Sequence, residues 1–224
     1  MVLVANPSTE TEQPLGIVRQ WLQEAAQRGR RRNPNATALA TVGPDGRPAV
    51  RIVLLKDVSV ADGYVVFYTN YRSRKARDLE HCEWAAAALY WEELGRQIRL
   101  EGRVRRSPDA ESDAYFASRP FRSQLNAWVS AQSEPLDDPE ELERRASDKA
   151  RGYPPGSGSA SDDAPRAVPR PPFWGGYRLW CDGVELWTEG LGRFHTRIRY
   201  TRTLTPVPAG GFRGQPWRSR RLQP

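Results

Sequence analysis

The sequence has few of the residues that bind metals or form disulfides. Its 224 residues include two cysteines, Cys82 and Cys181, and two histidines, His81 and His195. Two cysteines cannot build a disulfide framework, and the adjacent pair His81-Cys82 is a poor chelate for a metal ion. We therefore expect no metal site, and the reducing cytoplasm is the expected location.

Long hydrophobic runs and common catalytic motifs are also missing. No apolar stretch approaches the roughly 20 residues of a membrane-spanning helix. The opening MVLVANPSTE lacks the basic and apolar segments of a signal peptide. The sequence has no G-x-S-x-G, P-loop, G-x-G-x-x-G or H-E-x-x-H motif either, which excludes the commonest signatures of hydrolases, nucleotide-binding proteins and zinc proteases.

Lysine is scarce in a chain with a formal net charge of +7. Among the 34 basic residues, only Lys56, Lys75 and Lys149 are lysines, and the others are arginines. A positive surplus is typical of proteins that bind nucleic acid, a membrane surface or a phosphorylated small molecule. The preference for arginine resembles a codon bias, so the three lysines are more informative than the total charge.

The composition is that of a globular protein, with 38% hydrophobic and 27% charged residues. Short β-favouring segments are separated by turns rich in Gly, Pro and Asp, which favours an antiparallel sheet or barrel. The predicted strands are residues 37–42, 49–56, 64–69, 84–91, 97–105, 176–181, 184–188, 197–204 and 217–222. We therefore predict a mainly β fold, a β-barrel with peripheral helices.

Helical patterns surround these strands. Residues 16–29 carry apolar side chains at intervals of four, which predicts an amphipathic helix. Further helices are predicted at residues 74–81, 112–117, 121–130 and 140–150, with Ser73 and Ser107 as N-caps and Pro108 at a first helical position. We expect one domain over residues 15–224, preceded by a mobile tail at 1–14 and containing a flexible loop at about 151–168.

Basic residues on or beside the predicted strands are mixed with hydroxyl and amide residues, the mixture that phosphate binding needs. Arg51 and Lys56 lie five residues apart on one strand, so they would point to opposite faces unless a bulge intervenes. Both could instead be ordinary solvated cations. Ser73, Arg74 and Lys75 follow a strand and begin a helix, which predicts an anion site, although an amphipathic surface helix would show the same pattern.

Two further groups carry similar chemistry. Tyr115, Arg119 and Ser123 are spaced four residues apart and can all donate to phosphate oxygens, but Pro120 argues against one continuous helix. Arg193, His195 and Arg197 alternate, which predicts one shared strand face that needs an anionic ligand or a carboxylate partner. A basic, solvated strand is the alternative. Gln97, Arg99 and Glu101 also alternate and would share one strand face. Taken alone, this polar face indicates exposure to solvent.

Eight strings, in chain order, resemble one known family. They are RIVLLK (51–56), FYTNYRSRKA (67–76), RQIRLEGRV (96–104), YFASRPFRSQLNAWVSAQS (115–133), PRPPFWGGYRL (169–179), VELW (184–187), RFHTRIRY (193–200) and the ending RLQP. These strings are similar to the pyridoxamine 5′-phosphate oxidase family over residues 36–224, apart from the poorly matched 151–168. The resemblance implies an FMN-binding split β-barrel that works as a homodimer, with FMN in clefts between the subunits.

The resemblance also implies roles for individual residues. The residues that match ligands of the FMN phosphate are Arg51, Arg74 and Lys75. Further FMN contacts are matched by Tyr68, Thr69, Gln97, Gln132, Ser133, Trp187 and Arg197. The residues that match holders of the substrate phosphate are Lys56, Tyr115, Arg119 and Ser123. Arg193 and His195 match the catalytic pair that lies over the substrate ring.

The reaction implied by the resemblance is oxidation of pyridoxamine or pyridoxine 5′-phosphate to pyridoxal 5′-phosphate. FMN would accept a hydride, and dioxygen would reoxidise the flavin and give hydrogen peroxide. The chain departs from the usual family pattern, mainly on the substrate side, at Asn126, Thr188, Glu189, Phe194 and Thr196.

Two alternatives to this reaction remain. One is an FMN-dependent oxidase of another reduced ring, of the phenazine-biosynthesis type. The other is a non-catalytic protein that binds flavin or nucleic acid through its positive charge. The matched phosphate residues favour a phosphorylated small molecule as the partner, with no nucleic acid and no membrane.

Overall fold

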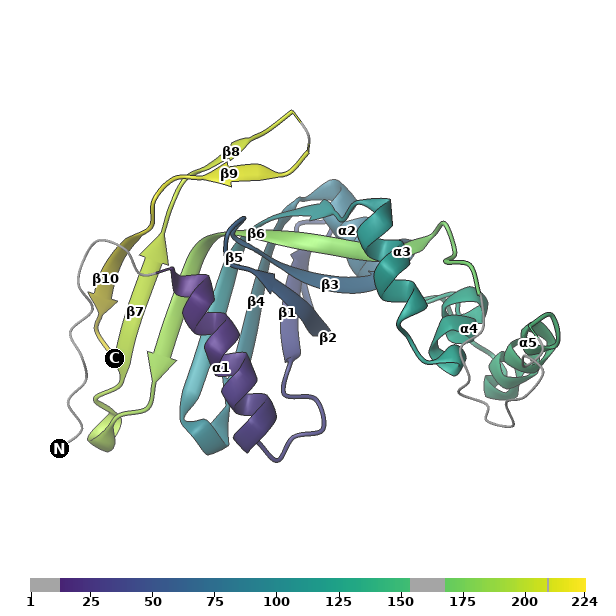
Figure 1. Ribbon diagram of the computed structural model, residues 1–224, viewed down its shortest axis with the longest axis horizontal. Coiled ribbons are helices and arrows are strands. Elements are labelled where there is room, and N and C mark those ends of the chain that lie inside the picture. Colours follow the sequence, from purple (N-terminus) through teal and green to yellow (C-terminus); the bar gives the residue numbers. More distant parts are fainter. Residues whose placement is uncertain (1–12, 154–167, 209) are drawn as a thin grey trace.

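A closed barrel of antiparallel strands forms the centre of the protein (Figure 1). The computed structural model describes residues 13–153, 168–208 and 210–224. The barrel strands are β1 (Ala36–Val42), β2 (Pro48–Ser59), β3 (Tyr64–Asn70), β4 (Trp84–Trp91), β5 (Arg96–Arg106) and β6 (Trp174–Thr188). They pair in the order β1–β2–β3–β6–β5–β4, and β4 pairs with β1 to close the ring. The predicted mainly β fold with a barrel is confirmed.

The longest strand, β6, joins the two ends of the barrel. Its first half pairs with β3, and its second half pairs with β7 (Thr196–Thr201), while β5 follows it along most of its length. The prediction of two strands, 176–181 and 184–188, is wrong, because β6 continues through Asp182 with a register shift against β5. The shift absorbs one extra residue without ending the strand.

Smaller strands extend the sheet beyond the barrel. β10 (Arg218–Leu222) pairs with β7, and β8 (Leu204–Pro206) and β9 (Phe212–Gly214) form a separate ribbon. The predicted strand 197–204 therefore ends at Thr201, and a new strand begins at Leu204.

The barrel interior is filled by the apolar half of each alternating strand. In β1 and β4, side chains that face inward are buried and their neighbours are more exposed. Leu39, Val65, Leu89, Ile98 and Leu100 are each at most 1% exposed. Full burial of one such side chain contributes about 1.5–3 kcal/mol, so this core accounts for the closed barrel.

Helix α1 (Pro14–Arg28) covers part of the barrel. It buries Leu15, Val18 and Ala25, and Glu24 accepts a hydrogen bond from Arg96 of β5 at 2.6 Å. The predicted helix 16–29 is confirmed, but it begins at Pro14, which was assigned to the tail. Residues 1–12 of the predicted tail lie outside the described residues, as does most of the predicted loop 151–168.

The remaining helices lie near one end of the barrel. They are α2 (Arg74–His81), α3 (Asp109–Ala117), α4 (Phe121–Val129) and α5 (Pro139–Arg151), and single 3₁₀ turns occupy Glu92–Leu94 and Leu191–Arg193. Figure 1 shows α4 and α5 at the opposite end of the molecule from β7 and β10. No helix in the described part of the chain is long and apolar enough to cross a membrane.

Of the two predicted serine caps, Ser73 is confirmed as the N-cap residue of α2, and Ser107 is wrong. Ser73 precedes α2 as expected, but its hydroxyl caps no backbone N–H and instead accepts from Lys75 Nζ at 2.9 Å. α3 begins at Asp109, so Pro108, and not Ser107, occupies the N-cap position. The expected break at Pro120 is confirmed, because α3 ends at Ala117 and α4 begins at Phe121.

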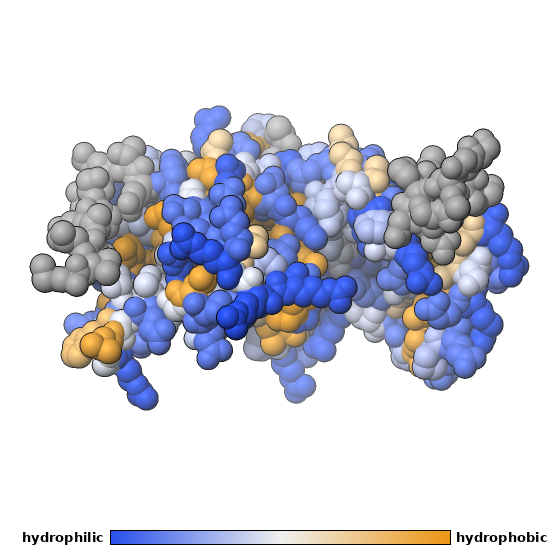
Figure 2. Space-filling view, turned by 60° about the horizontal axis from the view of Figure 1, so that its bottom comes forward, coloured by the Kyte–Doolittle hydropathy of each residue, from blue (hydrophilic) through white to orange (hydrophobic). Residues whose placement is uncertain are grey.

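The face of the molecule that Figure 2 shows is mainly hydrophilic, with separate hydrophobic patches. Large hydrophobic side chains are exposed at Val50, Ile52, Trp84, Tyr90, Leu136, Leu191 and Phe194. Four of them lie on β2 and β4, so the outer face of this part of the barrel is apolar. An exposed apolar face of this kind marks an interaction surface.

Candidate functional site

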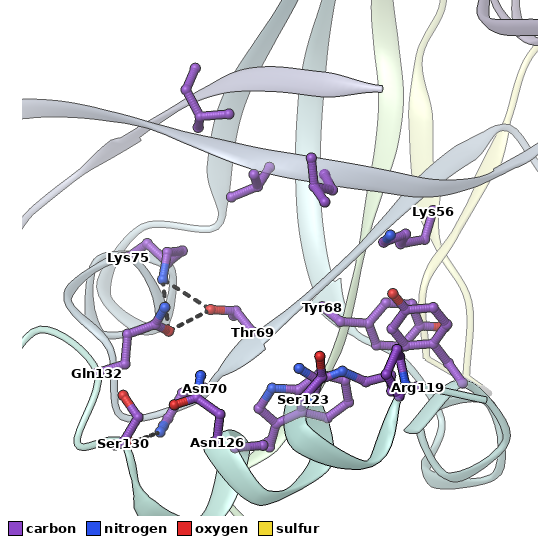
Figure 3. Close-up of a pocket in the computed structure, with 17 residues that line it drawn as sticks. Lys56, Tyr68, Thr69, Asn70, Lys75, Arg119, Ser123, Asn126, Ser130 and Gln132 are labelled. Carbon is purple, nitrogen blue, oxygen red and sulfur yellow. Dashed lines mark hydrogen bonds between the residues drawn. The ribbon is translucent and has the colours of Figure 1, made fainter. Parts of the chain in front are cut away.

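A cavity of about 400 Å³ lies where β2 and β3 meet α2, α3 and α4 (Figure 3). Eight of the predicted site residues line it: Lys56, Tyr68, Thr69, Lys75, Tyr115, Arg119, Ser123 and Gln132. These residues come from two strands, three helices and two loops, and they span more than 70 positions of the sequence. The fold therefore brings most of the predicted phosphate-binding residues into one cavity.

Lys75 lies at one end of this cavity with neutral partners. Its Nζ donates to Thr69 Oγ1 at 2.9 Å and to Gln132 Oε1 at 3.2 Å (Figure 3). It also donates to Ser73 Oγ at 2.9 Å. Lys75 is only 7% exposed. Burial, with a contribution from the charge of Arg51, lowers the pKa of Lys75 to about 8. A buried ammonium that has only neutral hydrogen-bond partners favours the binding of an anion.

Two more cations lie near Lys75. Arg51 does not line the cavity: its guanidinium donates to Thr41 Oγ1 at 2.6 Å and to Asp78 Oδ2 at 3.3 Å. Arg74 is the first residue of α2, and its backbone N–H donates to Ser133 Oγ at 3.2 Å. Three cations therefore gather around the N-terminus of a helix, whose dipole adds to their attraction for an anion.

Arg119 marks the other end of the cavity. Its guanidinium lies 4.5 Å from the centre of the Trp174 ring, and its buried Nη1 has no hydrogen-bond partner among the described residues. Burial lowers the pKa of Arg119. Because buried N–H groups are almost always hydrogen-bonded in proteins, this donor indicates that an acceptor belongs in the cavity.

Aromatic rings form one wall between these two ends. The rings of Tyr68 and Tyr115 stack at 3.8 Å, and both are nearly parallel to the Trp174 ring. Lys56 Nζ lies 5.8 Å from the centre of the Tyr115 ring. Gly176, opposite Tyr68 on β6, makes room for this wall, since a Cβ atom there would lie 2.9 Å from Tyr68 Cε1.

The structure agrees with the prediction that Arg51 and Lys56 point to opposite faces, because Lys56 lines the cavity with Ile52 and Leu54 and Arg51 does not. A bulge is present, since the register of β2 with β3 shifts between Leu55 and Asp57, but it lies at Lys56 itself and does not bring the two cations together. Tyr115, Arg119 and Ser123 line the same cavity although they do not share one helix. The turn at Pro120 therefore redirects the chain without separating these three side chains.

Five other predicted site residues form a second group, far from the cavity: Gln97, Trp187, Arg193, His195 and Arg197. Gln97, Trp187 and Arg197 lie side by side in one row across β5, β6 and β7. The ring of His195 lies 4.6 Å from that of Trp187. None of these residues lines the cavity.

The prediction that Arg193, His195 and Arg197 share one strand face is wrong. Arg193 ends the 3₁₀ turn Leu191–Arg193 with a positive φ of 67°, and β7 begins only at Thr196. Gly192, which precedes Arg193, also has a positive φ of 62°, an angle that glycine adopts readily. Only Arg197 lies on the strand.

Strand geometry separates the two groups within one chain. Thr69 of the cavity pairs with Gly175 near the start of β6, whereas Trp187 lies near its end. An extended strand rises by about 3.3 Å per residue, so roughly 40 Å of β6 lies between these positions. Figure 1 likewise shows β7 and α4 at opposite ends of the molecule. The two groups of one chain therefore cannot contact the same small ligand.

Comparisons with known sequences show the family of this chain. The family model described as "Pyridoxamine 5'-phosphate oxidase" matches residues 23–150. The chain belongs to the pyridoxamine 5′-phosphate oxidase family. A second model, "Pyridoxine 5'-phosphate oxidase C-terminal dimerisation region", matches residues 174–224, which contain β6 and the second group of predicted residues except Gln97.

Relatives named pyridoxine/pyridoxamine 5′-phosphate oxidase occur in distant bacteria. The one from Rubrobacter xylanophilus is 44% identical over 94% of this chain and 87% of its own length. The one from Brucella canis is 40% identical over 96% of each chain. These oxidase relatives therefore match almost the whole chain.

Solved structures share the fold. The structure of PhzG from Burkholderia lata 383, in complex with tetrahydrophenazine-1-carboxylic acid, has a TM-score of 0.79 and 32% identity, and the match covers 98% of this chain and 95% of that one. A pyridoxamine 5′-phosphate oxidase-related, FMN-binding protein from Nostoc punctiforme has a TM-score of 0.64 at 18% identity, covering 93% and 96%. The predicted split-barrel fold is confirmed.

The sequence interpretation missed two residues in or beside this cavity. Trp174 lines the cavity and stacks on Arg119, and Asp78 holds Arg51. The string WGGY did carry a signal for Trp174, because paired glycines inside a strand often mark a close approach of another group. No comparable local signal distinguishes Asp78, because its role depends on a contact with a distant strand.

Proposed function

We propose that this chain is an FMN-dependent oxidase that converts pyridoxamine 5′-phosphate or pyridoxine 5′-phosphate to pyridoxal 5′-phosphate. Dioxygen is the electron acceptor and hydrogen peroxide is released; the amine substrate also releases ammonia. The observation that carries the proposal is that one cavity contains two groups that need an anion. Lys75 has only neutral partners, and Arg119 has a buried N–H without an acceptor. The phosphates of a flavin and of a substrate would satisfy one each.

The Lys75 end suits the phosphate of FMN. Lys75, Arg51 and Arg74 supply positive charge, whereas Thr69, Gln132 and Ser133 supply neutral groups that fix orientation. Tyr68 lies between this end and Arg119 (Figure 3). When bound, FMN supplies the redox chemistry by accepting a hydride and passing electrons to dioxygen.

The Arg119 end suits the phosphate of the substrate. Arg119 would donate its unpaired N–H, and Lys56, Tyr115 and Ser123 add one cation and two hydroxyl groups. Trp174 and the stacked tyrosines make this end apolar, so the charged donors are little screened by water. Anchoring the phosphate here would hold the reactive carbon of the substrate in a single orientation.

The second group of residues would come from another subunit. A symmetric dimer presents the same surface twice, so it can place Gln97, Trp187 and Arg197 of each chain beside the cavity of the other. The apolar outer face of β2 and β4, with Val50 70% exposed and Ile52 65% exposed, supports such a dimer. The dimerisation region of the family model supports it as well.

In this dimer the substrate would be held from both subunits. Arg193 and His195 of the second subunit would face the end of the substrate away from its phosphate, where they can orient the ring and hold or move a proton. A cytoplasmic location is part of the proposal, since both Cys82 and Cys181 are free thiols.

The alternative is oxidation of another reduced ring. The likeness to PhzG, whose structure contains tetrahydrophenazine-1-carboxylic acid, is the observation that favours it. The unusual Asn126 lines the cavity, and Thr188, Glu189, Phe194 and Thr196 flank the turn with Arg193. Against it, four groups suited to a phosphate line the cavity: Lys56, Tyr115, Arg119 and Ser123.

An anaerobic titration tests the proposal. The purified protein should show the visible spectrum of FMN, and pyridoxamine or pyridoxine 5′-phosphate should bleach it without oxygen. Admitting air should restore the colour and produce one hydrogen peroxide per pyridoxal 5′-phosphate. A yellow protein that neither compound bleaches would contradict the substrate, and a protein that cannot bind FMN would contradict the oxidase. Tight, salt-sensitive DNA binding without turnover would favour the nucleic-acid alternative.

Replacing Arg119 by alanine should raise the KM for pyridoxamine 5′-phosphate about 30- to 100-fold, because a buried charge-assisted contact to the phosphate is lost. The kcat should change by less than about threefold, since the anchor holds ground state and transition state alike. Arg122→Ala is the matched control, because Arg122 is exposed on the next helix and does not line the cavity. Equal KM values for both variants would contradict the assignment.

The affinity for FMN should fall as the pH rises above about 8. The pKa of Lys75 in the empty site is lowered to about 8, so below this pH the ammonium is already charged. Above it, binding of a phosphate requires uptake of a proton, and the affinity should fall by up to about tenfold per pH unit. Fluorescence titration of apoprotein between pH 6.5 and 9.5 measures this. The decline should disappear in Lys75→Met; a decline that persists there belongs to another group.

A further inference from the structure

The outer face of β5, β6 and β7 carries two adjacent rows of side chains. The first row consists of Gln97, Trp187 and Arg197, which are the predicted flavin contacts. Directly behind it lies a second row, formed by Arg99, Glu185 and Arg199. Glu185 is only 3% exposed although it is a carboxylate, and buried carboxylates need close partners.

Glu185 reaches diagonally from the second row to the first. Its Oε1 accepts a hydrogen bond from Nε of Arg197 at 2.9 Å and forms an ion pair with Nη2 at 2.9 Å. The Nη1 of Arg197 donates to the backbone oxygen of Gln223, at the end of the chain, at 3.0 Å. Each nitrogen of this guanidinium is therefore engaged, which holds a long and flexible side chain in one position.

Glu185 does not fully neutralise Arg197, so the guanidinium can still attract an anion or an electron-rich ring. Glu185 Oε2 also accepts from Arg99 Nη1 at 3.3 Å, so two arginines share one carboxylate. Arg199 pairs instead with Glu101, at 2.9 Å from its Nη1. By contrast, no ion pair holds Arg193 among the residues that the structure describes.

We propose that Glu185 is a positioning residue, which fixes the guanidinium of Arg197 in the geometry that the flavin requires. The inference rests on the proposed function, because it takes Arg197 as a flavin contact. Its physical basis is preorganisation: a side chain already held in its bound position loses less conformational entropy when the cofactor binds. Glu185 itself need not touch the flavin.

Titration of apoprotein with FMN, followed by flavin fluorescence, tests this role. Glu185→Gln keeps the shape of the side chain but loses the charge, and the dissociation constant should rise about 10- to 100-fold, as for the loss of a hydrogen bond to a charged group. Glu101→Gln is the matched control, since Glu101 pairs with Arg199 and Arg99 but not with Arg197. Its dissociation constant should stay within about threefold of wild type.

A double variant separates positioning from general stabilisation. If Glu185 acts through Arg197, then Glu185→Gln should weaken FMN binding no further once Arg197→Met is present. Losses that multiply would indicate a structural role and overturn the proposal. Glu185→Asp covers the case in which Glu185→Gln does not fold, because it keeps the charge but is one methylene too short; its dissociation constant should still rise several-fold, and wild-type binding would overturn the proposal.

The proposed function and this inference fail differently. A wild-type protein that binds no FMN contradicts the proposed function. A wild-type protein that binds FMN, with Glu185→Gln binding it equally well, contradicts the role of Glu185 alone. Thermal unfolding of the apoproteins shows whether each variant is folded and is read before the titrations.

Discussion

A heterodimer of one Arg119→Ala subunit and one Arg193→Ala subunit is expected to be active, although each parent homodimer is nearly inactive at low substrate concentration. Arg119 lines the cavity, whereas Arg193 lies beyond the far end of β6. If each site takes Arg119 from one chain and Arg193 from the other, the heterodimer has one site with both changes and one site with neither. Its kcat should be about half that of wild type, with a wild-type KM.

The activities of the two parent homodimers set the baseline against which recovery in the heterodimer is measured. Arg119→Ala should lose activity because its KM is raised, as argued above. Arg193→Ala should lose activity because its kcat falls, by about a hundredfold or more if Arg193 orients the substrate or moves a proton. Co-expression with two different affinity tags and two successive purification steps isolates the heterodimer. Steady-state peroxide formation then measures recovery.

A second heterodimer is the matched control for shared sites. Arg119 and Ser123 line the same cavity, so Arg119→Ala paired with Ser123→Ala should leave one damaged residue in each site. This heterodimer should perform no better than the average of its two parents. If the Arg119/Arg193 heterodimer behaves in the same way, each site is built from a single chain.

Lys75→Met is expected to produce a nearly colourless protein. Methionine has a similar length but carries no charge, so the FMN phosphate loses a buried ammonium, and the dissociation constant should rise about a hundredfold or more. The ratio of flavin to protein absorbance after purification, followed by titration with FMN, measures the loss. Lys149→Met is the control, because Lys149 lies on α5 against the Trp128 ring and does not line the cavity.

Lys75→Met should weaken FMN binding but stabilise the protein without FMN. Burial lowers the pKa of Lys75 to about 8. Below this pH the buried lysine is charged, and keeping that charge out of water reduces the stability of the folded apoprotein. Lys75→Met should therefore raise the unfolding temperature of the apoprotein at pH 7 while removing most of the stabilisation that FMN adds. An apoprotein that becomes less stable, or one that retains FMN, would contradict a phosphate site at Lys75.

Local patterns predicted many elements because neighbouring residues determine them. Strand β4 and helix α2 occupy the predicted residues 84–91 and 74–81, where alternation and helical spacing are clear. β6 was divided in two because the sequence CDGV resembles a turn. Pairing with β5 on one side and with β3 and β7 on the other keeps that segment extended, and such partners are distant in sequence.

The sequence by itself determined the family, the barrel-type fold and the kinds of residue that suit phosphate, because these depend on residue identity and local spacing. Only the tertiary structure decided how those residues are distributed. It places Lys75 and Arg119 at two ends of one cavity, and it moves Arg193 off the strand that carries Arg197. The reason is that strand pairing and side-chain burial are set by contacts between segments far apart along the chain, which spacing within one segment does not encode.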